Sequence, residues 1–552
     1  RLSIIDLSNN ANQPMLSKDK RYILTFNGEI YNYKELRFEL IEAGYNFKTK
    51  SDTEVLLNAW QEWGEYSLEK LIGMFSFAVF DSHTFELFLI RDAFGIKPLY
   101  YYRSAKNIYF ASEIKSLLTL SGKKSELNNQ VIFEYINRGI IDHKEETFYK
   151  NIYQVRPAHF LKFNLKTSQK VKDCKWWDPS IENKFSGSYE KAVVQFRDLF
   201  LESVALHLRS DVPIGIALSG GLDSSAITCC ARFLKKDIDI HTFSYIPQDD
   251  NLSEEKWIDL VNNHVNAIDH KITFTNQELI CDLENLINSQ GEPFCSPSMY
   301  AQYRIFEEAK KQNIKVVLEG QGGDELLAGY EGYQGQRMNS LYETQKFQDM
   351  IEFAENWSKI RERGRFVIWK SFIGQRLSNK LFNLIENFLG IRNQISWSDK
   401  KIISEQEINT ACYIPSRNRD SSGRRVMEIL KHSISNYGLP ALLRYGDRNA
   451  MNFSIENRVP FLNTKIAEFL FSLPEDYLIS NSGNTKSILR DAMNGIVPKA
   501  LLDRKDKIGF ETPEDKIILD LYKKVKVQKN LRFPEILDQE NLIKHAQKII
   551  NK

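Results

Sequence analysis

The chain has 552 residues, of which 26% are charged, and its formal net charge is +2. Acidic and basic residues nearly balance, which excludes the broad positive charge typical of nucleic-acid-binding proteins. No apolar run approaches the roughly 18 residues of a membrane-spanning helix. We therefore expect a soluble protein of two or more domains that binds neither nucleic acid nor membrane.

The N-terminal part of the chain mixes strands with helices. YILTFNGEIYN predicts a strand that runs into a turn at Asn27-Gly28. Helices are predicted for YKELRFELIEAG and for SDTEVLLNAWQEWG, where Ser51 and Glu54 have capping-box spacing. GMFSFAVFDSHTFELFLIRD predicts a hairpin, and NIYFASEIKSLL predicts a strand followed by a helix. This mixture indicates a layered α+β domain.

The pattern changes after the polar stretch 165–188, which is predicted to connect two domains. YEKAVVQFRDLFLESVALHLRS predicts a long amphipathic helix, and VPIGIAL, DIDIHTFSYI and NIKVVLEG predict short buried strands. Strands that alternate with helical stretches indicate a parallel sheet with crossover helices. Residues from about 335 to 552 are predicted to be mostly helical.

Cysteine is sparse, with six residues and no C-x-x-C pair. This spacing argues against a thiolate metal site, and the low number favours a reducing compartment. We therefore expect a cytoplasmic protein.

The loop SGGLDSS follows the first buried strand of the second domain and directly precedes a helix. Glycines let the backbone approach an anion, and the helix N-terminus offers free N–H groups and positive dipole. The loop lacks the lysine of a Walker A motif, so it predicts pyrophosphate binding rather than transfer of a γ-phosphate. Asp223 offers a carboxylate for Mg²⁺ beside that pyrophosphate.

Three later segments fit the same chemistry. VVLEGQGGDELLAGY carries Asp324 and Glu325, and a second acid near Asp223 would share the Mg²⁺, although such a turn alone is often a plain loop. DRNAMNFSIENRVPFLN carries Arg448, Glu456 and Arg458, either as site residues or as a buried ion-pair network. LLDRKDKIGFETP clusters basic residues, either as a solvated loop or with Lys507 stabilising charge in an adenylation transition state.

Ten segments in order make the chain resemble glutamine-hydrolysing asparagine synthetase over essentially its whole length: RLSIIDLS, NGEIYN, SDTEVLL, GMFSFAVFD, RDAFGIKPLYY, ASEIKSLL, SGGLDSS, GQGGDEL, NRVPFL and RKDKIGF. The resemblance implies a class II glutamine amidotransferase domain at 1–170, an incomplete α+β N-terminal-nucleophile αββα sandwich. It implies an asparagine synthetase/ATP pyrophosphatase domain at 185–552, an α/β parallel-sheet nucleotide-binding domain with a helical C-terminal part. Aspartate would react with ATP and Mg²⁺ to form β-aspartyl-AMP. Ammonia from glutamine would travel through an internal tunnel and convert the adenylate to asparagine.

The resemblance also assigns site residues. Asn27 and Gly28 would form an oxyanion hole, Arg1 would hold the glutamine carboxylate, and Glu29 and Asp52 its α-amino group. The full glutamine set is Arg1, Leu2, Ile5, Asn27, Gly28, Glu29 and Asp52. The ATP set is Leu218, Ser219, Gly220, Gly221, Asp223, Ser224, Tyr245, Glu319 and Gly320, with Asp223 and Asp324 as metal ligands. The catalytic set is Asn27, Gly28, Gln321, Glu456 and Lys507.

Two departures from the family pattern stand out. Gln321 occupies a position where many members carry Glu, and the first cysteine is Cys174, although the family's nucleophile is an N-terminal Cys. We therefore expect the chain as written not to hydrolyse glutamine and the full-length protein to do so. Two alternatives remain: an adenylating amidotransferase for another carboxylate, on a sugar, a peptide or a β-amino acid, or a non-catalytic relative. The resemblance further suggests a homodimer.

Overall fold

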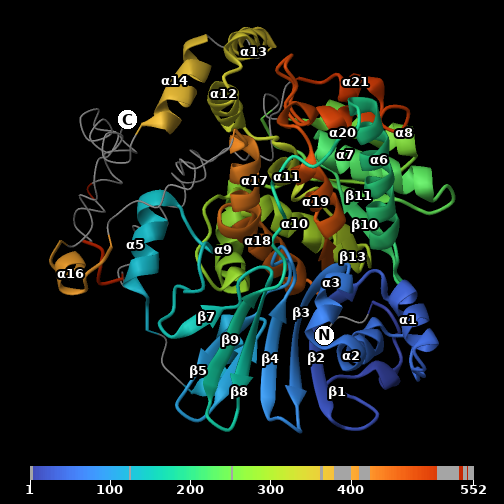
Figure 1. The fold of residues 1–552 in the computed structure, drawn as a ribbon, viewed down its shortest axis with the longest axis vertical. Coiled ribbons are helices and arrows are strands. Elements are labelled where there is room, and N and C mark those ends of the chain that lie inside the picture. The colour runs from blue at the N-terminus through green and yellow to red at the C-terminus, as the bar shows by residue number, and fades with distance from the viewer. Residues whose placement is uncertain are drawn as a thin grey trace.

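The computed structural model describes residues 4–122, 126–249, 253–360, 365–377, 400–409, 423–505, 534–538 and 544. Lys507 and the first two residues of the glutamine set, Arg1 and Leu2, lie outside the described residues. In Figure 1 the N-terminal region, in blue and cyan, forms the lower part of the molecule, and a second region with its own sheet lies above it.

The N-terminal region is built on a six-stranded antiparallel sheet in the order β1-β2-β3-β4-β8-β9. A second, three-stranded sheet has the order β6-β5-β7. The strands are β1 (Met15–Leu16), β2 (Tyr22–Ile30), β3 (Gly73–Asp81), β4 (Glu86–Arg91), β5 (Tyr100–Arg103), β6 (Ile108–Ala111), β7 (Ile152–Gln154), β8 (His159–Asn164) and β9 (Gln169–Lys175). The helices are α1 (Tyr33–Glu42), α2 (Asp52–Trp63), α3 (Ser67–Lys70), α4 (Ile114–Ser121) and α5 (Asn129–Arg138).

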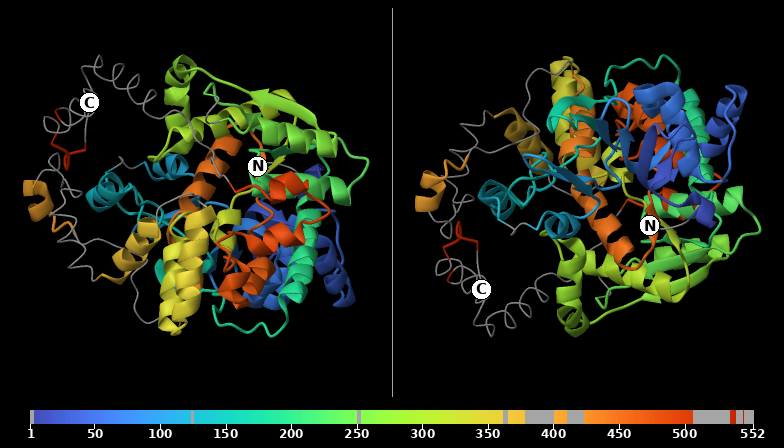
Figure 2. Two further views of the ribbon diagram at one scale, coloured as in Figure 1. Left: turned by 90° about the horizontal axis from the view of Figure 1, so that it is seen from above. Right: turned by 90° about the horizontal axis from the view of Figure 1, so that it is seen from below.

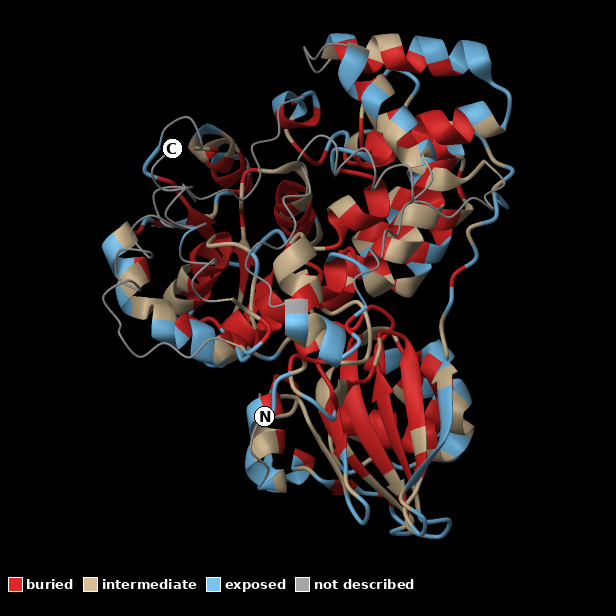
Figure 3. Cartoon of the chain, turned by 90° about the vertical axis from the view of Figure 1, so that its left-hand side faces the viewer, coloured by how far each residue is buried: buried red, intermediate tan, exposed pale blue. Residues whose placement is uncertain are grey.

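The two sheets pack face to face between helices, which is the predicted αββα order of layers. Phe77 of β3 packs against Trp60 of α2, while the next residue, Ala78, belongs to the cluster shared with Tyr101 of the second sheet. The neighbouring Tyr100 points the other way, into a cluster with Leu117 of α4. Period-2 alternation in each strand thus buries both sheet faces. Figure 3 shows the strands of the larger sheet as largely buried.

The predicted turn at Asn27-Gly28 is wrong, because β2 continues through both residues and pairs them with Ser76 and Phe75 of β3. Gly28 has φ +144°, and a Cβ there would lie 2.0 Å from the backbone oxygen of Met74. The glycine therefore permits a close approach of two strands, which a sequence pattern can easily mistake for a turn.

The other early predictions mostly hold. The hairpin forms from β3 and β4, and both helices end near the predicted glycines. The capping box at the start of α2 is wrong: Ser51 accepts the N–H of Thr53, but the Glu54 carboxylate accepts from the N–H groups of Lys48 and Thr49. The stretch predicted as a connection contains β9, which pairs with β8.

The second region holds a five-stranded parallel sheet in the order β12-β11-β10-β13-β14, as the alternating pattern predicts. Its strands are β10 (Ile214–Ala217), β11 (His241–Tyr245), β12 (Ile268–Ile272), β13 (Val316–Leu318) and β14 (Glu456–Arg458). The associated helices are α6 (Tyr189–His207), α7 (Leu222–Leu234), α8 (Glu255–Val265), α9 (Asn276–Gln290) and α10 (Ser298–Lys311). The prediction of a mostly helical C-terminal part missed β14, which has only three residues.

The rest of the described chain is helical. Its helices are α11 (Gly323–Leu327), α12 (Tyr333–Glu343), α13 (Phe347–Ile360), α14 (Arg365–Arg376), α16 (Lys400–Glu405), α17 (Arg425–Asn436), α18 (Leu439–Asn452), α19 (Thr464–Ser472), α20 (Ser487–Ala492) and α21 (Lys499–Leu502). α12 packs against α17 and α14. Seen from above (Figure 2, left), the yellow and orange helices lie nearest the viewer and the blue N-terminal region lies behind them. Among the described residues, no helix is both long and apolar enough to cross a membrane.

Candidate active sites

The loop after β10 is shaped for an anion. It leads directly into α7, whose N-cap is Gly221, and the Ser224 hydroxyl accepts the N–H of Ser219 at 3.2 Å. Gly220 has φ +79°, and a Cβ there would lie 3.1 Å from the backbone oxygen of Glu254. A conformation that glycine adopts freely thus turns the chain so that the N–H groups opening a 13-residue helix are available to phosphate.

This loop lines a cavity of about 370 Å³ together with the turn that follows β13. β10 and β13 are adjacent parallel strands, so their carboxyl ends lie at the same edge of the sheet. The structure therefore brings together most of the predicted nucleotide residues. Those that line the cavity are Leu218, Ser219, Gly221, Asp223, Ser224, Glu319, Gly320, Gln321 and Asp324.

The two acidic residues of the predicted metal set approach each other because glycines leave them room. A Cβ at Gly323 would lie 2.6 Å from the carboxyl carbon of Asp223, and a Cβ at Gly329 would lie 1.8 Å from Oδ1 of Asp324. Two carboxylates beside a phosphate cradle form a donor set that suits Mg²⁺, which commonly binds through one or two carboxylates and substrate phosphates. The described residues contain no cluster of three or more His, Cys, Asp or Glu suited to a metal, so phosphate oxygens would have to supply further ligands.

Lys486 lies between these two carboxylates, and the sequence did not predict it. Its Nζ is 2.5 Å from Oδ2 of Asp223 and 2.6 Å from Oδ1 of Asp324. Burial would lower the pKa of Lys486, but the two carboxylates together raise it to about 12. Lys486 is therefore a cation at neutral pH.

Other cations line the cavity near the phosphate loop: Arg490, Arg504 and Lys505. Arg504 donates from Nη1 to the carbonyl oxygen of Gly220 at 3.0 Å, and its Nη2 pairs with the carboxylate of Glu254. This guanidinium therefore supports the phosphate loop through the carbonyl of Gly220. The cavity as a whole combines cations with N–H donors, as a polyphosphate requires.

Some predicted nucleotide residues lie elsewhere. Gly220 is in the loop but does not line the cavity; its carbonyl meets Arg504. Tyr245 also lies outside the lining and stacks on Phe274, with ring centroids 4.8 Å apart. Glu456 is buried and its carboxylate accepts from Nε of Arg458 at 2.7 Å, so it belongs to an ion-pair network away from this cavity. The structure therefore contains, between Glu456 and Arg458, an ion pair of the kind that one of the two interpretations of this segment expected.

The predicted glutamine residues that are described lie in the N-terminal region, where Glu29 faces Arg458 of the second region. Glu29 and Asp52 are both buried, and Asp52 accepts the backbone N–H of Ile30. Burial, and then Asp52 and Glu456, raise the pKa of Glu29 well above its ordinary value, although Arg458 opposes them from 3.7 Å. Ile5 is buried nearby in the same hydrophobic core.

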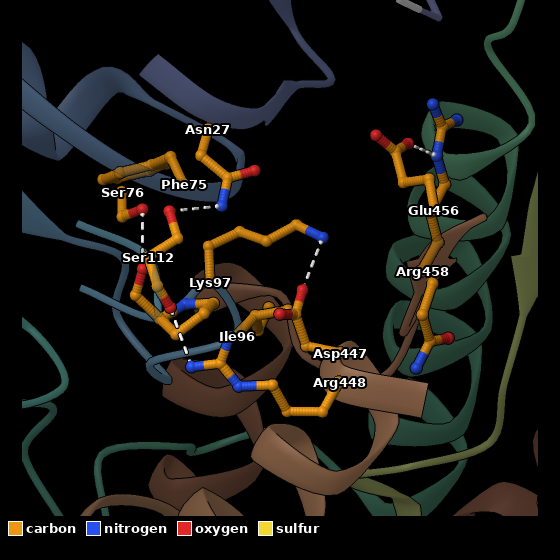
Figure 4. Close-up of polar contacts among 12 residues, drawn as sticks. Asn27, Phe75, Ser76, Ile96, Lys97, Ser112, Asp447, Arg448, Glu456 and Arg458 are labelled. Atoms are coloured by element: carbon orange, nitrogen blue, oxygen red, sulfur yellow. Dashed lines mark hydrogen bonds and ion pairs between the residues drawn. The ribbon is translucent and has the colours of Figure 1, made fainter. Parts of the chain in front are cut away.

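The amide of Asn27 donates to the hydroxyl of Ser112 at 3.1 Å, and the carbonyl of Ser112 accepts from Arg448 of α18 at 2.7 Å (Figure 4). The neighbouring Asp447 binds Lys97 of the N-terminal region. One turn of α18 therefore binds Lys97 and Ser112, and Ser112 in turn accepts the amide of Asn27.

The next residue of α18 points toward the nucleotide cavity. Asn449 donates to Oε1 of Gln302 at 3.0 Å, and Gln302 donates to Glu319 at 3.0 Å. Both Gln302 and Glu319 line the cavity. Burial raises the pKa of Glu319, although its hydrogen bonds oppose the rise. The two candidate sites are therefore linked by consecutive residues of one helix.

Comparison with known proteins assigns the family. The asparagine synthase profile matches residues 195–548, and the profile of a glutamine amidotransferase domain matches residues 1–177. The chain is 30% identical to asparagine synthetase [glutamine-hydrolyzing] 1 of Bacillus subtilis, over 93% of this chain and 79% of that protein. It is 31% identical to asparagine synthetase [glutamine-hydrolyzing] 2 of the same organism, over 89% and 62%. It is also 25% identical to amidase chry2 of Gibberella zeae, over 92% and 79%.

The chain thus belongs to the asparagine synthase family. Membership places it among the ATP-dependent carbon–nitrogen ligases that take their amide nitrogen from glutamine, and the resemblance found in the sequence is confirmed.

Proposed function

We propose that this protein converts aspartate to asparagine with ATP, and that glutamine supplies the ammonia. The observation that carries the proposal is the single cavity in which the phosphate loop, the acidic turn and Lys486 meet. The matched ranges 1–177 and 195–548 support a division of labour between an amidotransferase domain, residues 1–170, and a synthetase domain, residues 185–552.

In the first step the β-carboxylate of aspartate attacks the α-phosphorus of ATP, and the bond to the β-phosphate breaks. Ser219, Gly221 and Ser224 donate to the leaving pyrophosphate at the N-terminus of α7, where the helix dipole stabilises its charge. Mg²⁺ held by Asp223 and Asp324 would neutralise charge on the same phosphates. Lys507, which lies outside the described residues, would add a further cation.

In the second step ammonia attacks the acyl carbon of β-aspartyl-AMP, the bond to AMP breaks, and a proton leaves the nitrogen. Water must be kept out, because it would hydrolyse the adenylate. The burial of Gln302, Glu319 and Asn449 supports a dry wall between this cavity and the N-terminal region. Ammonia would pass from the glutamine site in the N-terminal region to this cavity.

At the glutamine site Asn27 and Gly28 would supply the oxyanion hole, and Glu29 and Asp52 would receive the α-amino group of glutamine. The paired, buried carboxyls of Glu29 and Asp52 support this assignment, because an ammonium group would relieve their mutual repulsion. Arg1, Leu2 and Ile5 complete the proposed set.

The test is pyrophosphate release by the purified chain with ATP, Mg²⁺, aspartate and ammonium. We expect release that depends on aspartate, and a loss of at least about 100-fold in Asp223→Ala, because the phosphate site loses a charged group used in the transition state. Unchanged release in Asp223→Ala would refute the site assignment. An exposed control, Asp259→Ala on α8, should leave the rate unchanged.

One observation supports a second candidate acceptor. Gln321 lines the cavity where many relatives carry Glu, so the acceptor side of the pocket has one fewer negative charge. A related carboxylate, on a sugar or a peptide, would replace aspartate in that case. Pyrophosphate release with such an acceptor but not with aspartate would establish this alternative, whereas failure to bind ATP and Mg²⁺ at millimolar concentration would indicate a non-catalytic relative.

The proposal extends to the setting of the enzyme. We propose a cytoplasmic homodimer that acts on small molecules and has neither a nucleic-acid nor a membrane partner. The near-neutral net charge of +2 supports the absence of a nucleic-acid partner. Light scattering on the purified chain tests the dimer.

A further inference from the structure

Lys486 has an unusual position for a lysine. Its ammonium lies within 2.6 Å of both carboxylates that are expected to hold Mg²⁺, and its side chain is 7% exposed. A divalent cation bridging Asp223 and Asp324 would need the same space. The lysine and a metal ion in that place therefore exclude each other.

The local backbone and a glycine hold the lysine there. Lys486 has φ +56° and ψ +33°, a left-handed conformation that is uncommon for residues other than glycine and asparagine, at the start of α20. A Cβ at Gly329 would lie 2.2 Å from Cε of Lys486, so only glycine leaves room for this side chain. Strained backbone that places a charged group in a site is a feature of functional positions.

The side chain of Lys486 also has space in which to move. It lines the 370 Å³ cavity, and four side-chain torsions can carry its ammonium from the carboxylates toward a bound phosphate. Arg504 differs, because its guanidinium is tied to Gly220 and Glu254 behind the loop. Of these two cations, Lys486 is the one that can change partners within the cavity.

We propose that Lys486 occupies the metal position in the nucleotide-free enzyme and gives it up when ATP and Mg²⁺ enter together. The inference rests on the proposed ATP site. The lysine balances part of the charge of two neighbouring carboxylates in the empty site, and then moves to the polyphosphate as the metal takes its place. Binding of the metal without nucleotide is therefore suppressed, and the enzyme takes up metal and nucleotide as one complex.

The exchange is tested by metal binding, without reference to catalysis. Mn²⁺ replaces Mg²⁺ as a paramagnetic probe, and free Mn²⁺ is measured by electron paramagnetic resonance in the absence of nucleotide. Lys486→Met keeps the length of the side chain and removes its charge, so we expect Mn²⁺ to bind at least about tenfold more tightly than to the wild type. Lys465→Met, at an exposed lysine, is the matched control and should bind Mn²⁺ as the wild type does.

Two further variants test where the extra Mn²⁺ binds and guard against misfolding of Lys486→Met. Asp324→Asn added to Lys486→Met should abolish the gain, which locates the extra Mn²⁺ between the two carboxylates. Lys486→Gln replaces Lys486→Met if thermal unfolding shows that the methionine variant does not fold. Equal Mn²⁺ affinity in the wild type and a folded Lys486 variant would overturn the exchange, as would tight nucleotide-free binding to the wild type.

A separate measurement distinguishes this inference from the proposed function. Binding of a fluorescent ATP analogue to the wild type with Mg²⁺ reports on the nucleotide site itself. Absence of that binding would refute the proposed function, whereas the Mn²⁺ comparison decides whether lysine and metal compete. In the wild type we expect the analogue to increase Mn²⁺ affinity at least about tenfold, and in Lys486→Met to increase it much less.

Discussion

The ammonium of Lys97 lies 3.0 Å from the carboxylate of Asp447, although 350 residues separate them along the chain. Their side chains are 2% and 5% exposed. Burial lowers the pKa of Lys97, but Asp447 and other carboxylates raise it by more than burial lowers it. The lysine therefore remains charged. This ion pair joins the N-terminal sheet region to α18 of the second region.

Removal of one partner should destabilise the whole molecule. Asp447→Asn leaves a buried ammonium with reduced compensation, and such a loss typically costs about 3–5 kcal/mol. We expect a fall in the thermal midpoint of several degrees, measured by differential scanning calorimetry. Lys465→Met breaks the exposed pair with Glu202 and should change the midpoint little. Equal effects of the two variants would contradict the structural role of the buried pair.

Gly329→Ala should weaken nucleotide binding. The added methyl group would lie 1.8 Å from Oδ1 of Asp324 and 2.2 Å from Cε of Lys486, so one of these side chains has to move. We expect the Kd for ATP with Mg²⁺ to rise at least about tenfold in isothermal titration calorimetry, because the change displaces the expected metal ligand Asp324 or the cation Lys486. Gly374→Ala is the control, since its methyl group meets nothing within 4 Å. It should leave ATP binding unchanged and stabilise α14 by up to about 1 kcal/mol.

Arg504→Lys should also weaken ATP binding, although the charge is retained. The guanidinium reaches both the carbonyl of Gly220 and the carboxylate of Glu254, which a single ammonium group cannot match in geometry. The phosphate loop then loses its support, and we expect a Kd for ATP about three- to tenfold higher, with a larger increase in Arg504→Met. Arg103→Lys, at an exposed position in β5, should have no effect on the Kd. An unchanged Kd in both Arg504 variants would show that the loop holds its conformation without this support.

His207 should make the protein sensitive to acid. Burial, reinforced by the charge of Arg458, lowers its pKa to about 3, from an ordinary value of 6.5. Below about pH 6.5 the imidazole of His207 therefore binds a proton in the unfolded chain but remains unprotonated in the folded chain. The free energy of unfolding must fall as the pH decreases from 6.5 toward 3.

Between pH 7 and pH 5 the wild type should lose about 2 kcal/mol more than His207→Gln, measured by urea unfolding at both pH values. His83→Gln, at an exposed histidine, should follow the wild type. A loss in His207→Gln as large as that in the wild type would contradict the assignment.

Local patterns were sufficient to predict the parallel sheet of the second region, the first helices and the strand, loop and helix around SGGLDSS. A strand that ends at Ala217, the glycine pair of SGGLDSS and a helix that starts at Leu222 follow one another directly, and all three are local properties of the chain. The buried networks were not predictable in this way. Nothing near Lys486 in the sequence indicates two carboxylates 263 and 162 residues away, because the contacts depend on how α20 packs against the sheet edge.

The differences between the expected and the observed positions of these residues also have physical causes. Gly28 looks like a turn residue, but here it allows β3 to approach β2 closely. Tyr245 is the last residue of β11, and its ring stacks on Phe274. Glu456 sits in β14, where Arg458 is its partner, and a three-residue strand gives too short a pattern to recognise. For Gly28 and Tyr245 the competing interaction is with residues distant in the sequence, whereas Arg458 lies only two residues from Glu456.

The contacts of Asp447, Arg448 and Asn449 have a consequence for attempts to divide this protein. Asp447 and Arg448 bind Lys97 and the carbonyl of Ser112, and Asn449 binds Gln302. A single turn of α18 therefore contacts both halves of the molecule. If the N-terminal half were expressed alone, Lys97 would lose its counter-ion and the Ser112 carbonyl its guanidinium donor. The halves can therefore be exchanged between family members only as matched sets that include this turn, and chimaeras joined at the interdomain connection alone should fold poorly.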